Sequence, residues 1–107
     1  MRLTKKYTHG CVYAISSKET GVVYVGATRT SLAVRMGMHR AAARAGRTSP
    51  ITRWMRENMG IESAMVLLDN VPVVDLDAVE QRFIEAFKAS GAGLLNVQAT
   101  YYDKSPD

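Results

Sequence analysis

Residues 11–39 read CVYAISSKETGVVYVGATRTSLAVRMGMH, and this stretch decides the fold. β-Branched and aromatic residues lie on both sides of a polar turn, which predicts an antiparallel hairpin with strands at 10–16 and 22–26. Each predicted strand carries a tyrosine, Tyr13 on the first and Tyr24 on the second. Because side chains alternate between the faces of a strand, each tyrosine shares its face with small or β-branched residues, as in a packed hairpin.

A helix is expected after the hairpin. Thr30 or Ser31 can cap its start, and it is expected to end near Ala45, before a glycine. A helical wheel places Arg35 and His39 one turn apart, between two apolar arcs. The first arc contains Val34, Met38, Ala41 and Ala45, and the second contains Leu32, Met36 and Ala43. A cation and a histidine between two packed surfaces indicate the wall of a cleft.

The rest of the chain predicts a short helix, a buried strand and a last helix. These elements are expected at 49–60, at 61–69, and from Asp75 or Asp77 to about residue 90, with a turn at 70–72. Strands and helices do not alternate as they would in parallel crossover units. An α+β fold, with a small antiparallel or mixed sheet flanked by helices, is therefore expected.

Positive charge is concentrated in the first part of the chain. Residues 1–60 carry 11 lysines and arginines against two acids, whereas residues 61–107 carry three against eight. The planar guanidinium suits phosphate better than the point charge of lysine does, so the arginines predict a polyanion-binding face. The candidate nucleic-acid contacts are Arg29, Arg40, Arg44, Arg47 and Arg53, although each alone would also fit a solvated surface.

The length of 107 residues predicts one domain, and 47% hydrophobic with 22% charged residues is typical of a globular chain. No apolar run approaches the ~18 to 20 residues of a membrane span, and no signal-type segment follows the basic start. No membrane contact is therefore expected. The single cysteine, Cys11, cannot form an internal disulfide, which fits a reducing compartment and predicts a cytoplasmic location.

An acidic side chain interrupts the apolar face of the last predicted helix. Glu80 lies in the middle of an arc formed by Leu76, Val79, Phe83, Ile84 and Phe87. A carboxylate on a core-facing stripe costs several kcal/mol unless it is paired, protonated or bound to a metal. Two interpretations stay open: an ion pair with one of the arginines, or a carboxylate that holds a divalent cation in a cleft.

These residues together resemble the GIY-YIG nuclease family over about residues 10–97. The matches in chain order are Cys11-Val12-Tyr13, Tyr24-Val25-Gly26, Arg35, His39, Glu80 and Asn96. Two departures stand out: a cysteine occupies the usual glycine position of the first triplet, and the tyrosine that usually precedes the asparagine is missing. The resemblance implies a three-stranded antiparallel sheet flanked by helices.

The resemblance also implies hydrolysis of DNA through one divalent metal, Mg²⁺ or Mn²⁺, leaving 5′-phosphate and 3′-hydroxyl ends. Glu80 would hold the metal, which stabilises the leaving 3′ oxyanion. Arg35 would donate to the phosphate oxygens as charge builds on them. Asn96 would position a loop or the site through its amide.

A tyrosine would activate the attacking water, although its reference pKa of ~10 makes it a poor base at neutral pH. Tyr13 is assigned as the general base, with its pKa lowered by Arg35 and His39, and Tyr24 as the group that orients water or phosphate. The reverse assignment stays open. His39 would relay a proton or contact phosphate.

The whole chain is expected to be a single nuclease domain, with a basic lead-in at 1–9, a core at 10–97 and an extension at 98–107. DNA is the expected partner, in duplex, branched or single-stranded form. Low sequence specificity is expected, because the sequence shows no second domain to read bases. A protein partner could supply the specificity. The alternative is a non-catalytic or partner-dependent nucleic-acid-binding module. The complete set of polar matches disfavours the non-catalytic form, and the partner-dependent form stays open.

Overall fold

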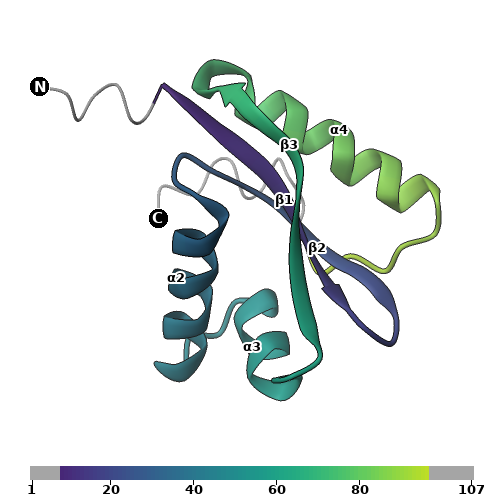
Figure 1. Ribbon diagram of the computed structural model, residues 1–107. Helices are drawn as coiled ribbons and strands as arrows, with labels where there is room; N and C mark the ends of the chain where they lie inside the picture. The colour runs from purple at the N-terminus through teal and green to yellow at the C-terminus, as the bar shows by residue number, and fades with distance from the viewer. Residues whose placement is uncertain (1–7, 97–107) are drawn as a thin grey trace, which may run out of the picture.

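The computed structural model describes residues 8–96 and contains one antiparallel sheet of three strands in the order β2-β1-β3. The strands are β1 (His9–Ser17), β2 (Gly21–Thr28) and β3 (Glu62–Pro72). Helices pack on both faces of the sheet (Figure 1), so the predicted α+β fold is confirmed. Most of the predicted lead-in and the whole C-terminal extension lie outside the described residues. No described helix is long and apolar enough to cross a bilayer.

The first strand, β1, is the centre of the fold. Val12, Tyr13, Ala14 and Ile15 are completely buried, because β1 pairs with β2 on one side and with β3 on the other. Alternate side chains enter opposite layers, so Tyr13 and Ile15 belong to one core and Val12 to the other.

Helices α2 (Leu32–Arg44) and α3 (Pro50–Glu57) cover one face of the sheet, as Figure 1 shows. Serines start both helices as expected: Ser31 Oγ accepts from a main-chain N–H of α2, and Ser49 Oγ does the same for α3. Met36 of α2 and Met55 of α3 pack against the β1 tyrosine and its neighbours. This layer therefore carries Arg35 and His39 to the sheet.

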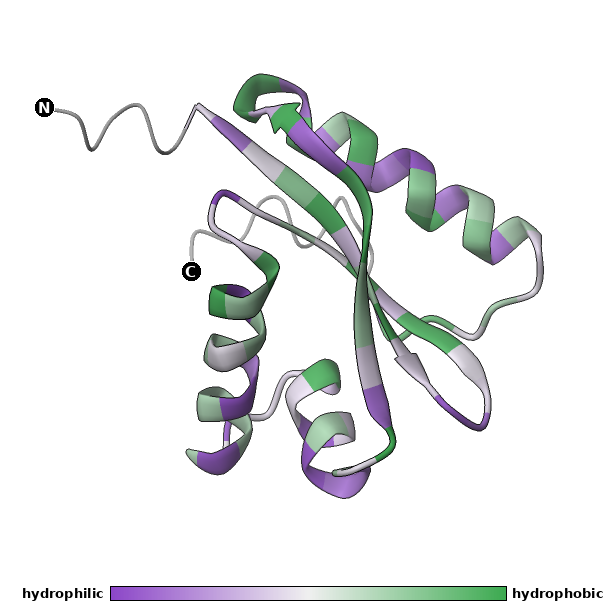
Figure 2. Cartoon of the chain, viewed as in Figure 1, coloured by the Kyte–Doolittle hydropathy of each residue, from purple (hydrophilic) through white to green (hydrophobic). Residues whose placement is uncertain are grey.

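Helix α4 (Leu76–Ala89) covers the opposite face and follows a single 3-10 turn, η1 (Val73–Asp75). Its apolar side chains pack with Val12 of β1 and Val25 of β2. Hydrophobic and hydrophilic residues alternate along this helix (Figure 2). Asp75 occupies the N-cap position, although its side chain makes no capping hydrogen bond. The helix thus starts where the sequence predicts.

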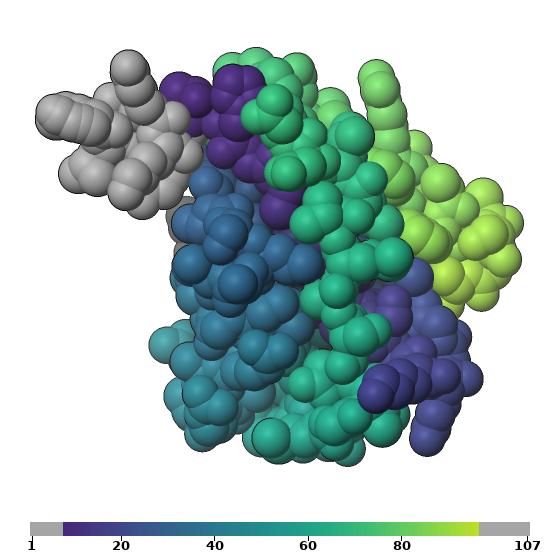
Figure 3. Space-filling model, in the orientation of Figure 1, coloured from purple at the N-terminus to yellow at the C-terminus, as the bar shows by residue number. Residues whose placement is uncertain are grey.

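The expectation of a buried third strand is wrong. β3 is an edge strand, and its atoms run along the surface of the molecule (Figure 3). Met65 and Leu68 are 53% and 46% exposed. The predicted turn at 70–72 is also wrong, because the strand continues to Pro72. Asn70 lies within this strand and has a positive φ of 56°. Helix α4 packs on β2 and β1, which leaves part of the outer strand uncovered.

The first predicted apolar arc of α2 does not pack as expected. Val34 and Met38 are each 52% exposed, whereas Met36, His39 and Ala43 are buried. The helix therefore turns the second arc and the histidine toward the sheet. Met38 instead lines an open cavity beside the histidine.

Candidate active site

Tyr13, Arg35 and His39 are joined by hydrogen bonds at the junction of β1 and α2. The Tyr13 hydroxyl lies 2.9 Å from His39 Nε2, and Arg35 Nε donates to the same hydroxyl at 3.4 Å. A guanidinium can only donate, so the hydroxyl accepts from Arg35 and is left with its one proton to donate. The hydroxyl can donate this proton to His39 Nε2 in the tautomer that carries its hydrogen on Nδ1.

His39 is neutral near pH 7. Burial, with a smaller contribution from the Arg35 charge, lowers the pKa of His39 from 6.5 to about 4. A neutral imidazole has one ring nitrogen that can accept, so Nε2 can accept from the Tyr13 hydroxyl.

The expected lowering of the Tyr13 pKa is wrong. Burial raises the pKa of Tyr13 above its usual value of 10.0, and the opposing effect of Arg35 is smaller. The side chain is completely buried, so desolvation of a phenolate outweighs the nearby cation. Tyr13 therefore remains a neutral phenol that holds the arginine and the histidine in place.

Gly26 makes room for the Tyr13 ring. The two residues face each other across β1 and β2, and a Cβ on Gly26 would lie 2.5 Å from the Tyr13 hydroxyl oxygen. It would also lie 2.9 Å from a ring carbon of Tyr24. The glycine of the Tyr24-Val25-Gly26 triplet is thus required by the packing of both tyrosines.

Substitution of this glycine tests the packing directly. Gly26→Ala is expected to lower the free energy of unfolding by about 1–3 kcal/mol, because the new methyl group overpacks a buried ring. Gly37→Ala is the matched control, since its new methyl group meets nothing within 4 Å on exposed α2 and should stabilise the helix by about 0.5–1 kcal/mol. Urea unfolding measures both, and equal stability of Gly26→Ala and wild type would contradict the proposed clash.

Tyr24 is half-buried and faces open space. Its ring packs edge-on to the His39 ring at 5.8 Å between centroids and lies 6.4 Å from the Tyr13 ring. Tyr24 and Arg35 line two neighbouring cavities, so they stand between them. Tyr13 lines neither of these two cavities. Of the two tyrosines, Tyr24 is the one placed to meet a substrate.

The smaller cavity, of about 180 Å³, brings Glu80 to the arginine and the tyrosine. Asp77 lies one turn before Glu80 on α4 and lines the same cavity, as do Thr28 and Arg29. Sequence analysis missed Asp77 as a site residue and considered it only as a helix cap. The three-residue spacing from Glu80 is the signal that would have placed both carboxylates on one face.

The smaller cavity offers oxygen ligands of the kind that a hard cation needs. Nowhere in residues 8–96 do three or more His, Cys, Asp or Glu side chains gather around one point. Mg²⁺ does not require such a cage, because it keeps several waters and binds through one or two carboxylates. The carboxylates of Glu80 and Asp77, beside the Thr28 oxygens, therefore fit this ion.

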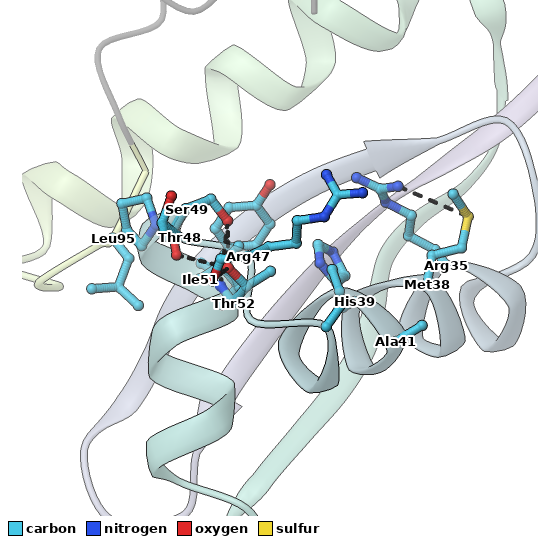
Figure 4. Close-up of a pocket in the computed structure, with 14 residues that line it drawn as sticks. Arg35, Met38, His39, Ala41, Arg47, Thr48, Ser49, Ile51, Thr52 and Leu95 are labelled. Atoms are coloured by element: carbon cyan, nitrogen blue, oxygen red, sulfur yellow. Dashed lines mark hydrogen bonds between the residues drawn. The ribbon is translucent and has the colours of Figure 1, made fainter.

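The larger cavity, of about 890 Å³, lies between α2 and the start of α3. Arg35 and His39 form one end of it, and the α2–α3 loop with Arg47 forms the other (Figure 4). The remaining arginines predicted to contact nucleic acid, Arg40, Arg44 and Arg53, are exposed and line neither cavity.

The side chain of Asn96 forms hydrogen bonds with the main chain of β2. Its Oδ1 accepts from Val25 N–H at 3.1 Å, and its Nδ2 donates to the Val25 carbonyl at 2.7 Å. Leu95 N–H donates to the Val23 carbonyl at 2.7 Å, so the segment after α4 covers the outer edge of β2. Leu95 and Asn96 together therefore hold the backbone on either side of Tyr24, and the positioning role of Asn96 stays a prediction.

The depressed pKa of His39 makes stability depend on pH. The unfolded chain binds a proton at this histidine near pH 6.5, whereas the folded chain binds it only near pH 4. The free energy of unfolding is therefore highest above pH 6.5 and decreases as the pH falls toward 4. We expect a loss of about 2 kcal/mol between pH 7 and pH 5. Urea unfolding should show this loss in wild type and in His9→Gln, an exposed-histidine control, but much less in His39→Gln. The same pH dependence in all three proteins would contradict the lowered pKa of His39 as its cause.

Comparison with models of protein families gives a match. The family model of the GIY-YIG catalytic domain matches residues 9–92, from the start of β1 to just past α4. This range includes both tyrosines, Arg35, His39 and Glu80, whereas Asn96 lies beyond it. No curated protein and no solved structure matches the chain.

Proposed function

The chain belongs to the GIY-YIG catalytic-domain family, and from this membership we propose that it is a metal-dependent endonuclease that hydrolyses DNA phosphodiester bonds. One observation carries the proposal. Tyr24, Arg35 and Glu80, from β2, α2 and α4, line a single small cavity. A potential proton acceptor, a cation and a metal-binding carboxylate are the groups that phosphodiester hydrolysis requires.

Glu80 would hold Mg²⁺ or Mn²⁺, with Asp77 supporting it directly or through water. When bound, the ion supplies Lewis-acid stabilisation of the departing 3′ oxygen. Arg29 lines the same cavity from the end of β2 and would contact an adjoining phosphate.

Tyr24 and Arg35 both line the two cavities and would act on the scissile phosphate at the boundary between them. The phenolate of Tyr24 takes a proton from the attacking water while the water oxygen bonds to phosphorus and the P–O3′ bond breaks. The 3′ oxygen then takes a proton from solvent. Arg35 donates to the non-bridging oxygens, whose negative charge grows in the transition state.

Tyr13 and His39 would position the reacting groups. Tyr13 accepts from Arg35 Nε and so fixes the direction in which the guanidinium group extends. His39 packs edge-on against the Tyr24 ring and restrains it. This arrangement exchanges the roles first assigned to the two tyrosines, because Tyr24 lines the cavities and Tyr13 is buried.

The arginines of α2 and α3 would contact the DNA backbone. Arg40, Arg44 and Arg53 are exposed and carry charge that a phosphate attracts at any base sequence. Low intrinsic sequence specificity follows from contacts of this kind.

A plasmid-nicking assay tests the proposed function. Supercoiled DNA should be converted to nicked and linear forms with Mg²⁺ or Mn²⁺, and EDTA should stop the reaction. End-labelling should find 5′-phosphate and 3′-hydroxyl ends. DNA binding without cleavage at any divalent-metal concentration would favour the non-catalytic module instead.

A further inference from the structure

The larger cavity is lined by two arginines, and none of the lining residues within 8–96 is acidic. Arg35 and Arg47 enter it from opposite ends and extend toward each other above His39 (Figure 4). His39 is neutral near pH 7 and adds no charge, so the two arginines give the described lining side chains a net positive charge. An anionic ligand is therefore the occupant that this end of the cavity favours.

The backbone of Arg47 is held in place by hydrogen bonds. Its N–H donates to the Ala42 carbonyl at 3.0 Å, and its carbonyl accepts from Thr52 Oγ1 at 3.2 Å. Arg56 Nη1 donates to the same carbonyl and to the Ala43 carbonyl, both at 3.0 Å. The loop thus presents the Arg47 side chain from a fixed base on α2 and α3.

The wall of this cavity is mostly apolar. Tyr24 and His39 line it together with small and aliphatic side chains, which are Met38, Ala41, Ala42, Ala45 and Leu95. Its volume of about 890 Å³ lies within the usual range of about 300–1,000 Å³ for small-molecule sites. A cavity of this size, with apolar walls and arginines at both ends, suits a nucleotide, which joins an aromatic base to a phosphate.

We propose that this cavity binds the nucleotide next to the scissile phosphate, with its base against the alanine wall of α2 and its phosphate on Arg47. The inference rests on the proposed nuclease function and adds a substrate class to it. A base inside a duplex is stacked and paired, so it must leave the helix to enter such a cavity. DNA that is unpaired beside the cleavage point is therefore the preferred substrate.

Binding measurements test the subsite without requiring cleavage. Anisotropy of a labelled single strand and of a duplex of equal length, with the full chain in EDTA, gives Kd and its salt dependence. Ala42→Leu fills the cavity and should raise Kd for the single strand about tenfold, while duplex binding stays unchanged. Arg47→Ala should reduce the slope of log K against log salt by about 0.7 for the single strand.

Each variant has a matched control. Ala33→Leu makes the same change at an exposed α2 position that lines neither cavity, and Arg82→Ala removes the same charge from exposed α4. Both controls should bind as wild type does, and circular dichroism melting should show that all four variants are folded. Equal effects of Ala42→Leu on single-stranded and duplex DNA, or none, would overturn the subsite. Failure of the nuclease proposal would appear separately, as absent nicking by wild type.

Discussion

Glu80→Gln is expected to reduce Mg²⁺-dependent nicking by about 10³-fold, because the variant keeps the size of the side chain but removes the charge that binds the ion. The glutamate lines the small cavity with Tyr24 and Arg35, so a metal held there would meet the phosphate that the arginine contacts. DNA affinity in EDTA should not fall, since the substitution removes a negative charge from a site that binds a polyanion.

Direct metal binding separates this role from a structural one. Electron paramagnetic resonance of Mn²⁺ should show a bound fraction in wild type that Glu80→Gln loses. Asp77→Asn should weaken Mn²⁺ binding less, because Asp77 is more exposed than Glu80. Glu85→Gln is the control, since Glu85 is exposed on α4 and lines neither cavity. Undiminished nicking by Glu80→Gln would exclude Glu80 as the metal ligand.

The local part of the fold could be predicted from the sequence. The serine caps before α2 and α3 and the hairpin turn are read from neighbouring residues, and these elements lie close to their expected positions. The place of β3 in the sheet could not be read in this way. Its central run, 64–68, is as apolar as the run in β1, and only long-range pairing makes β1 central and β3 an edge.

The candidate site could be predicted as a set of residues but not as an arrangement. The helical spacing of Arg35 and His39 indicated a cleft wall, and Glu80 was conspicuous on an apolar face. The pKa of Tyr13 depends on how completely the surrounding layers bury its side chain. Residue type and spacing do not reveal that degree of burial. Charge neighbours alone predicted a lowered pKa, whereas desolvation raises it.

The two tyrosines should respond differently to loss of the hydroxyl. Tyr24→Phe is expected to reduce nicking about 10³-fold, because it removes the group proposed to take the proton from water. Tyr13→Phe should reduce nicking only about tenfold but lower stability by about 1–3 kcal/mol, since it leaves Arg35 Nε and buried His39 Nε2 without their shared partner. Initial nicking rates and urea unfolding of both variants measure this contrast.

The pH dependence of cleavage identifies which tyrosine ionises. Tyrosine has a reference pKa of about 10, so a phenolate mechanism predicts a rate that rises about tenfold per unit between pH 7 and pH 9. His39 cannot cause this rise, because it is already neutral throughout that range. The rise should persist in Tyr13→Phe and disappear from the residual activity of Tyr24→Phe. A rise that disappears with Tyr13→Phe instead would return the role of base to the buried tyrosine.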